Sequence, residues 1–93
     1  MTTQQKALGK RLFIYDGFSG TSYVGRTINA IMYSTDNPSK VELYTYKDGR
    51  KGDYELITRM RADLFDTMAN CGKVTVNSTT DGCDYIDIYQ IKD

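Results

Sequence analysis

The 93-residue sequence contains no histidine and no tryptophan, one proline, and two cysteines, Cys71 and Cys83. Histidine is the side chain that most often transfers protons near neutral pH, and it is the commonest metal ligand. Two cysteines are too few for a disulfide framework or for a zinc site made of cysteine alone. We therefore expect no cofactor, no metal and no enzymatic activity.

Long apolar runs and an excess of charge are absent as well. No stretch approaches the roughly 20 apolar residues that span a bilayer, and residues 1–9 lack the apolar segment of a secretory signal. We expect a cytoplasmic protein that does not enter a membrane. The 12 basic and 12 acidic residues balance, whereas a nucleic-acid-binding domain usually has a pI above about 9. A local basic patch is still compatible with this balance.

Tyrosine and aspartate are abundant instead. The chain has eight tyrosines, and most of its acidic residues are aspartate. Aspartate favours turns and helix caps over helix interiors, and tyrosine suits half-exposed sheet faces and interfaces. Alternating apolar and polar residues predict strands at 10–15, 21–24, 40–46, 54–58, 73–77 and 84–91. Segment 25–33 fits a strand or a helix, and its β-branched residues and short length favour a strand.

One helix is predicted at about residues 59–70. Its apolar residues recur at spacings of three and four, and Gly72 stands where a C-terminal cap is expected. We predict an α+β fold: a polar, flexible N-terminal arm at 1–9, then a single domain at 10–93. This domain would have an antiparallel sheet of five to six strands with the principal helix on one face. One helix cannot cover so wide a sheet. The rest of the sheet should therefore be exposed to solvent, curl into a barrel or bind a partner.

The candidate partner-binding residues are four tyrosines on the predicted strands. Tyr44 and Tyr46 alternate with Val41 and Leu43, while Tyr85 and Tyr89 alternate with Ile86 and Ile88. If the helix packs on the aliphatic side of each strand, the candidate set is partly exposed: Tyr44, Tyr46, Tyr85 and Tyr89. The alternative is that these residues form ordinary cross-strand pairs, which stabilise a sheet by about 0.2–1 kcal/mol each.

Charged residues supply two further candidate sites. The hairpin loop 47–53, which we call the basic loop, carries Lys47, Arg50 and Lys51 beside two glycines. A projecting basic hairpin of this kind could contact the phosphates of a nucleic acid. An ordinary solvated loop is the alternative, because Asp48 and Asp53 partly cancel the charge. The acidic run Asp81, Asp84 and Asp87 does not match a calcium loop. It could dock on a basic partner or mimic phosphates, or simply protect a sheet edge from aggregation.

These observations favour a small regulatory protein that docks on a larger protein. Compact chains of this size that are rich in Asn, Asp, Thr and Tyr are common among phage and mobile-element accessory proteins, and such a protein could act as an inhibitor. A homodimer would add stability to so short a chain. The alternative is a nucleic-acid-binding domain that uses an aromatic sheet face and the basic loop. The two cysteines would lie at opposite ends of a hairpin, too far apart for a disulfide.

Overall fold

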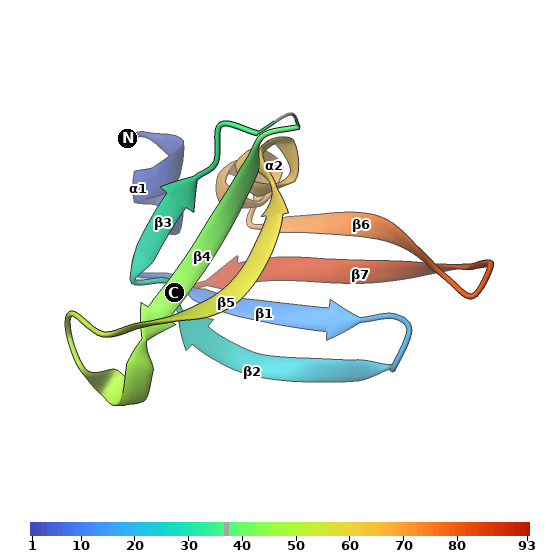
Figure 1. The fold of residues 1–93 in the computed structure, drawn as a ribbon, viewed down its shortest axis with the longest axis horizontal. Helices are drawn as coiled ribbons and strands as arrows, with labels where there is room; N and C mark the ends of the chain where they lie inside the picture. Colours follow the sequence, from blue (N-terminus) through green and yellow to red (C-terminus); the bar gives the residue numbers. More distant parts are fainter. Residues whose placement is uncertain (37) are drawn as a thin grey trace.

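The computed structural model describes residues 1–36 and 38–93, apart from the side chain of Val24, and its strands form two antiparallel sheets (Figure 1). The four-stranded sheet has the order β2-β1-β7-β6, and the three-stranded sheet has the order β3-β4-β5. The strand bounds are β1 Arg11–Asp16, β2 Thr21–Thr27, β3 Ala30–Tyr33, β4 Lys40–Tyr46, β5 Tyr54–Arg61, β6 Lys73–Thr80 and β7 Cys83–Lys92. Asn37, in the predicted turn at 36–39, lies outside the described residues.

The principal helix, α2 (Ala62–Cys71), follows β5 without a loop. It begins later than predicted because β5 continues through Arg61, which pairs with Lys40 of β4. Its end is as predicted: Gly72 has a φ of 86°, and its N–H donates to the Met68 carbonyl at 2.7 Å. Glycine adopts this left-handed conformation without steric cost, so the chain can leave the helix and enter β6 at once.

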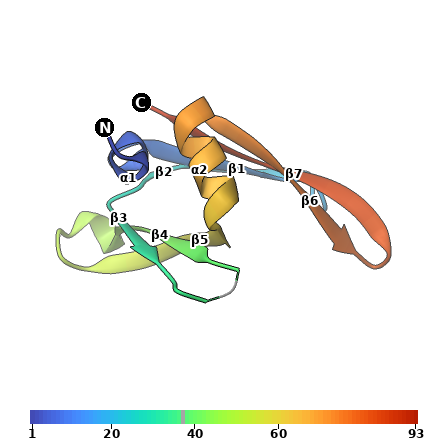
Figure 2. The ribbon, with the colours of Figure 1, turned by 90° about the horizontal axis from the view of Figure 1, so that it is seen from above.

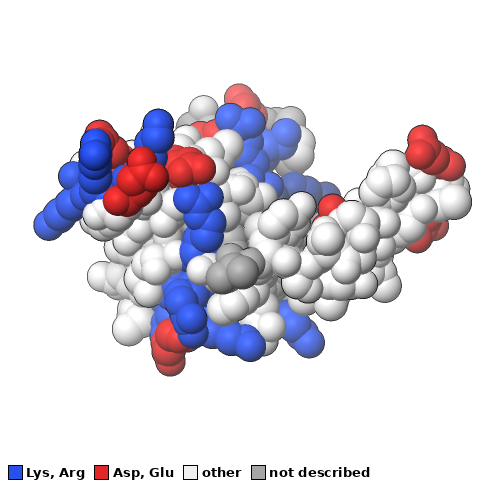
Figure 3. Space-filling view, turned by 90° about the horizontal axis from the view of Figure 1, so that it is seen from below, with Lys and Arg blue, Asp and Glu red and all other residues white. Residues whose placement is uncertain are grey.

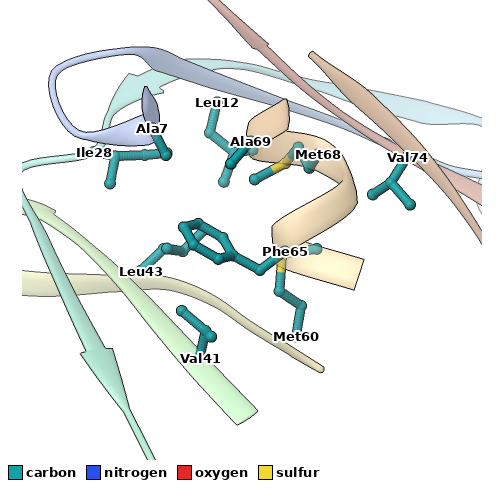
Figure 4. Close-up of a cluster of buried hydrophobic side chains, with 10 residues drawn as sticks. All are labelled: Ala7, Leu12, Ile28, Val41, Leu43, Met60, Phe65, Met68, Ala69 and Val74. Carbon is teal, nitrogen blue, oxygen red and sulfur yellow. The ribbon is translucent and has the colours of Figure 1, made fainter. Parts of the chain in front are cut away.

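The hydrophobic core lies between the two sheets, where α2 packs (Figures 2 and 4). Phe65 and Met68 project from α2 and are fully buried. Figure 4 shows that residues from both sheets and from the N-terminal segment surround them. The buried apolar residues are Ala7, Leu12, Ile28, Val41, Leu43, Met60, Phe65, Met68, Ala69 and Val74. The α+β class and the single principal helix are thus confirmed.

The strands divide into two sheets, rather than one sheet of five or six strands, because the chain changes sheet between β2 and β3. Ile28 is fully buried there. Its N–H donates to the Lys10 carbonyl, next to the four-stranded sheet, while the N–H of Asn29 donates to the Tyr44 carbonyl of the three-stranded sheet. The extended interpretation of segment 25–33 is correct, with β2 ending at Thr27 and β3 beginning at Ala30.

The N-terminal segment, expected to be a flexible arm, contains a short helix, α1 (Thr3–Ala7). Thr2 and Gln5 form a capping box, in which each side chain accepts a backbone hydrogen bond from the other residue. Ala7 is fully buried, and Lys6 Nζ donates to Asn70 Oδ1 of α2 at 2.7 Å. The structure therefore places this segment on the core, and its mobility in solution stays a prediction.

The β6–β7 hairpin extends well past the three-stranded sheet, together with the connected ends of β1 and β2 (Figures 1 and 2). Its register is continuous from the Lys73–Gln90 pair to the Thr80–Cys83 pair. Cys83 lies at the turn and Cys71 beyond the open end, as predicted. Among the described residues, no helix has the length and the apolar character that crossing a membrane requires.

Candidate binding surfaces

The outer face of the three-stranded sheet carries an aromatic cluster. Side chains alternate along β4 as predicted: Val41, Leu43 and Thr45 are buried, and the residues between them face outward. Tyr44 lies opposite Ala30 and Leu56, and Tyr46 lies opposite Tyr54. We call this surface the tyrosine face and define it as Ala30, Met32, Tyr44, Tyr46, Tyr54 and Leu56. Neither the helices nor the four-stranded sheet cover it (Figure 2).

Local contacts hold the tyrosine face in shape. The rings of Tyr46 and Tyr54 have centroids 5.5 Å apart and a tilt of 48°, an arrangement that contributes about 0.5–1.5 kcal/mol beyond simple burial. Next to Tyr44, Arg59 Nε donates to Glu42 Oε2 at 2.5 Å. This hydrogen bond lowers the pKa of Glu42. Desolvation and the Glu42 charge raise the pKa of Tyr44, so its phenol is neutral at physiological pH.

Asn29 fixes the backbone behind this face. Its Oδ1 accepts hydrogen bonds from the N–H of Tyr46 at 2.9 Å and from Oγ1 of Thr45 at 3.2 Å. Thr45 is buried, so its hydroxyl depends on this partner. Sequence reasoning missed Asn29, because nothing in its surroundings distinguishes it from a loop asparagine. Its role arises only when the β2–β3 connection lies against β4.

The basic loop, residues 47–53, connects β4 to β5 and comes directly after Tyr46 of the tyrosine face. Residues 47–49 form a short 3₁₀ turn, and Asp48 and Gly49 have φ values of 53° and 72°. The N–H of Lys47 donates to the Asp53 carbonyl, which closes the loop at its base. The three predicted cations, Lys47, Arg50 and Lys51, are exposed and take part in none of the ion pairs found in the described chain. The structure thus brings them next to Tyr46 and Tyr54.

Tyr85 and Tyr89 do not join Tyr44 and Tyr46. They lie on the inner face of the four-stranded sheet, and Tyr89 packs against the core while Ile86 is 55% exposed. The expectation that the isoleucine side of this strand faces inward was wrong. Tyr89 pairs with Ile14 of β1 and Val74 of β6, both of which face the core, so the register turns the tyrosine side inward. Burial raises the pKa of Tyr89, and Asp87 raises it further.

A groove of about 600 Å³ lies where the inner face of the four-stranded sheet extends past the core. β5 borders it through Ile57 and Thr58. Asp87 accepts hydrogen bonds from the Gly17 N–H at 2.9 Å and from Ser78 Oγ at 3.1 Å. The rings of Phe18 and Tyr85 meet edge to face, with centroids 5.1 Å apart. The groove lining is Ile14, Asp16, Phe18, Tyr23, Ile57, Thr58, Ser78, Thr80, Asp87 and Tyr89.

The three aspartates of the predicted acidic run do not share one surface. Asp87 faces the groove, whereas Asp84 accepts a hydrogen bond from Thr79 Oγ1 at 3.0 Å, and Asp81 lies in the hairpin turn with a φ of 55°. In the described part of the chain, histidine, cysteine and acidic side chains nowhere gather in a group of three that could hold a metal ion.

Comparison with known proteins identifies no relative of this chain. No family model, no curated protein and no solved structure matches this chain.

Proposed function

We propose that the chain is a small, non-enzymatic binding protein that docks on a larger protein through the tyrosine face. The observation that carries this proposal is the uncovered outer side of the three-stranded sheet. There Met32 is 57% exposed and Tyr54 is 49% exposed, beside Tyr44 and Tyr46. Tyrosine and methionine are enriched at protein interfaces, and tyrosine supplies contact area at a low cost in conformational entropy.

A regulatory or inhibitory role, as in phage or mobile-element accessory proteins, would follow if the docked chain covers a working surface of its partner. We place the interaction in the cytoplasm, where both cysteines would stay reduced. Asn29 holds the backbone of Tyr46 and the hydroxyl of Thr45, so little ordering of this strand is needed on binding. A pre-organised surface of this kind loses less affinity to conformational entropy. A homodimer through the same face is the simplest competing arrangement.

The test is affinity capture from a cell lysate with the tagged protein and with the double variant Tyr44→Ala/Tyr46→Ala. We expect the variant to lose captured proteins that the unmodified chain retains, while its circular dichroism spectrum is unchanged. Tyr15→Ala is the control, because Tyr15 is 40% exposed on the four-stranded sheet, away from this face. Equal capture by all three proteins would eliminate the tyrosine face as the docking surface.

A nucleic-acid-binding function is the second candidate, favoured by the position of Lys47, Arg50 and Lys51 beside the tyrosine face. Stacking of single-stranded bases on exposed aromatics contributes about 1–3 kcal/mol per base. The test is fluorescence anisotropy with labelled single- and double-stranded DNA and RNA at low and moderate salt. Under this hypothesis Arg50→Ala/Lys51→Ala weakens binding and flattens its salt dependence, while Lys73→Ala, at the start of β6, does not. If no nucleic acid binds at low salt, docking on a protein partner stays the working hypothesis.

A further inference from the structure

One stretch of the four-stranded sheet, which reaches from the edge of the core to the projecting end, has a charge opposite to that of the rest of the molecule. We call its residues, 14–25 and 74–90, the acidic arm; Val74 at its base belongs to the core. It contains Asp16, Asp81, Asp84 and Asp87 and no lysine or arginine. All 12 basic residues therefore lie elsewhere, with the other eight acidic residues, which leaves the remaining chain with a formal charge of about +4. In Figure 3 the projecting end shows red and white atoms only, while the blue atoms lie on the body.

Two of these four carboxylates line the groove, and hydrogen bonds hold both in place. Asp87 accepts from Gly17 and Ser78, as described above, and Asp16 Oδ1 accepts from the N–H of Phe18 at 2.9 Å. A carboxylate can accept about four hydrogen bonds, so both retain capacity for a further donor. The four ion pairs among residues 1–36 and 38–93 involve neither carboxylate.

Aromatic and aliphatic side chains form the rest of the groove. Phe18 and Tyr23 are 52% and 56% exposed, and Tyr89 is half-buried beside them. Aromatic faces attract ammonium and guanidinium groups, and carboxylates bind them through charge-assisted hydrogen bonds. The apolar stem of such a side chain would have Ile14 and Ile57 to pack against. A phosphate group, in contrast, would be repelled by both carboxylates.

We propose that this groove binds an arginine or lysine side chain from an exposed segment of a partner protein. The charge of the acidic arm attracts the basic segment, Asp16 and Asp87 bind its cationic group, and the aromatic side chains cover it. The groove lies on the other sheet from the tyrosine face, so this second surface stands independently of the proposed function. Among the described residues, no third histidine, cysteine or acidic side chain joins the two carboxylates, which makes a metal ion a poor occupant.

The test is fluorescence anisotropy with a labelled hexapeptide in which arginine alternates with glycine, at 20 mM and 150 mM salt. A peptide with glutamate in place of arginine is the negative control. We expect salt-dependent binding of the arginine peptide alone. Asp16→Asn/Asp87→Asn should weaken it at least tenfold. Asp81→Asn/Asp84→Asn removes the same charge from the same arm but outside the groove lining, and should weaken it less than threefold.

A second pair of variants keeps the proposal testable if Asp87→Asn impairs folding. Thr80→Lys places a lysine in the groove lining, where it should compete with the peptide, whereas Thr79→Lys adds the same charge to the opposite face of β6. Only Thr80→Lys should abolish binding. Equal weakening by the matched variants, or no binding at 20 mM salt, would overturn the proposal. Light scattering that shows self-association, lost in Asp16→Asn/Asp87→Asn, would also overturn it by making a second copy the occupant.

Discussion

The backbone N–H of Gly17 donates a hydrogen bond of 2.9 Å to a carboxylate oxygen of Asp87, 70 residues further along the chain. The contact joins the β1–β2 turn to the middle of β7. A Cβ atom built on Gly17 would lie 2.1 Å from the carbonyl oxygen of Ile86, so only glycine allows this approach. The same contact brings Asp16 and Phe18 to the groove that Asp87 lines.

Gly17→Ala should therefore destabilise the protein. The added methyl group meets backbone rather than a movable side chain, so we expect a loss of about 1–3 kcal/mol in the free energy of unfolding. The measurement is urea denaturation followed by circular dichroism. Gly20→Asn is the control, because Gly20 has a φ of 71° and open space around it, and asparagine tolerates that conformation. Similar losses in both variants would argue against the packed turn.

Phe65→Ala should be the most damaging single truncation in α2. The ring is fully buried and meets Tyr33 edge to face, with centroids 6.1 Å apart. Removing a buried phenylalanine side chain costs about 3–5 kcal/mol, which would unfold much of a marginally stable chain. Thermal unfolding measures this effect. Asp66→Ala, at the next and exposed position of the helix, should change stability by no more than about 0.5 kcal/mol.

Asn29→Ala should affect both stability and partner capture. It leaves the N–H of Tyr46 and the buried hydroxyl of Thr45 without their acceptor, at a cost of about 1–3 kcal/mol. Asn29→Asp keeps an acceptor oxygen and should lose less. Denaturation gives the stability change, and capture from a lysate reports whether Tyr46 still presents its ring. If the alanine variant is as stable as the original chain, the hydrogen bonds of Asn29 do not hold β4.

The raised pKa of Tyr89 predicts how stability changes at high pH. Burial, and secondly Asp87, raise this pKa above its ordinary value of 10.0, so the folded protein favours the neutral phenol. The stabilisation is complete below pH 10 and decreases as the pH rises through the folded-state pKa, because the unfolded chain loses this proton first. Melting temperatures between pH 8 and pH 11 should fall less steeply in Tyr89→Phe. Parallel curves for the two proteins would contradict the raised pKa.

Cys71 and Cys83 should react independently with a thiol reagent. Both are exposed and free, and the hairpin between them has eight paired positions at about 3.3 Å per residue, which places them more than 20 Å apart. We expect two reactive thiols per native chain and no internal disulfide after mild oxidation. Mass spectrometry of the oxidised monomer checks this. An internal bridge would show that β6 and β7 pair in another register.

Most of the individual elements were predictable from local patterns. Strict alternation identified β4 and its buried side, and apolar residues at helical spacing together with Gly72 identified α2. The start of α2 was misplaced because Arg59–Arg61 fit a helix locally, and only pairing with β4 keeps them in β5. α1 was missed because four polar residues and one buried alanine carry almost no apolar signal.

The candidate sites were predicted less completely. That Tyr44 and Tyr46 lie near the basic loop was predictable, because they belong to one hairpin and their adjacency is local. Tyr89 was assigned to the wrong side because one face of the β7 segment carries isoleucines and the other carries tyrosines. Both kinds of side chain can be buried, and a period of two cannot then say which face is inside. The groove was not foreseen, because its residues come from β1, β2, β5, β6, β7 and a turn.

The sequence by itself therefore determined the α+β class, the main strands, the helix and the outward-facing tyrosines of β4, because these depend on neighbours a few residues apart. Only the tertiary structure decided the division into two sheets, the orientation of β7 and the separation of an acidic arm from a basic body. Each of these depends on contacts between distant segments, such as Ile28 in the core and Gly17 against Ile86. Local periodicity carries no information about such contacts.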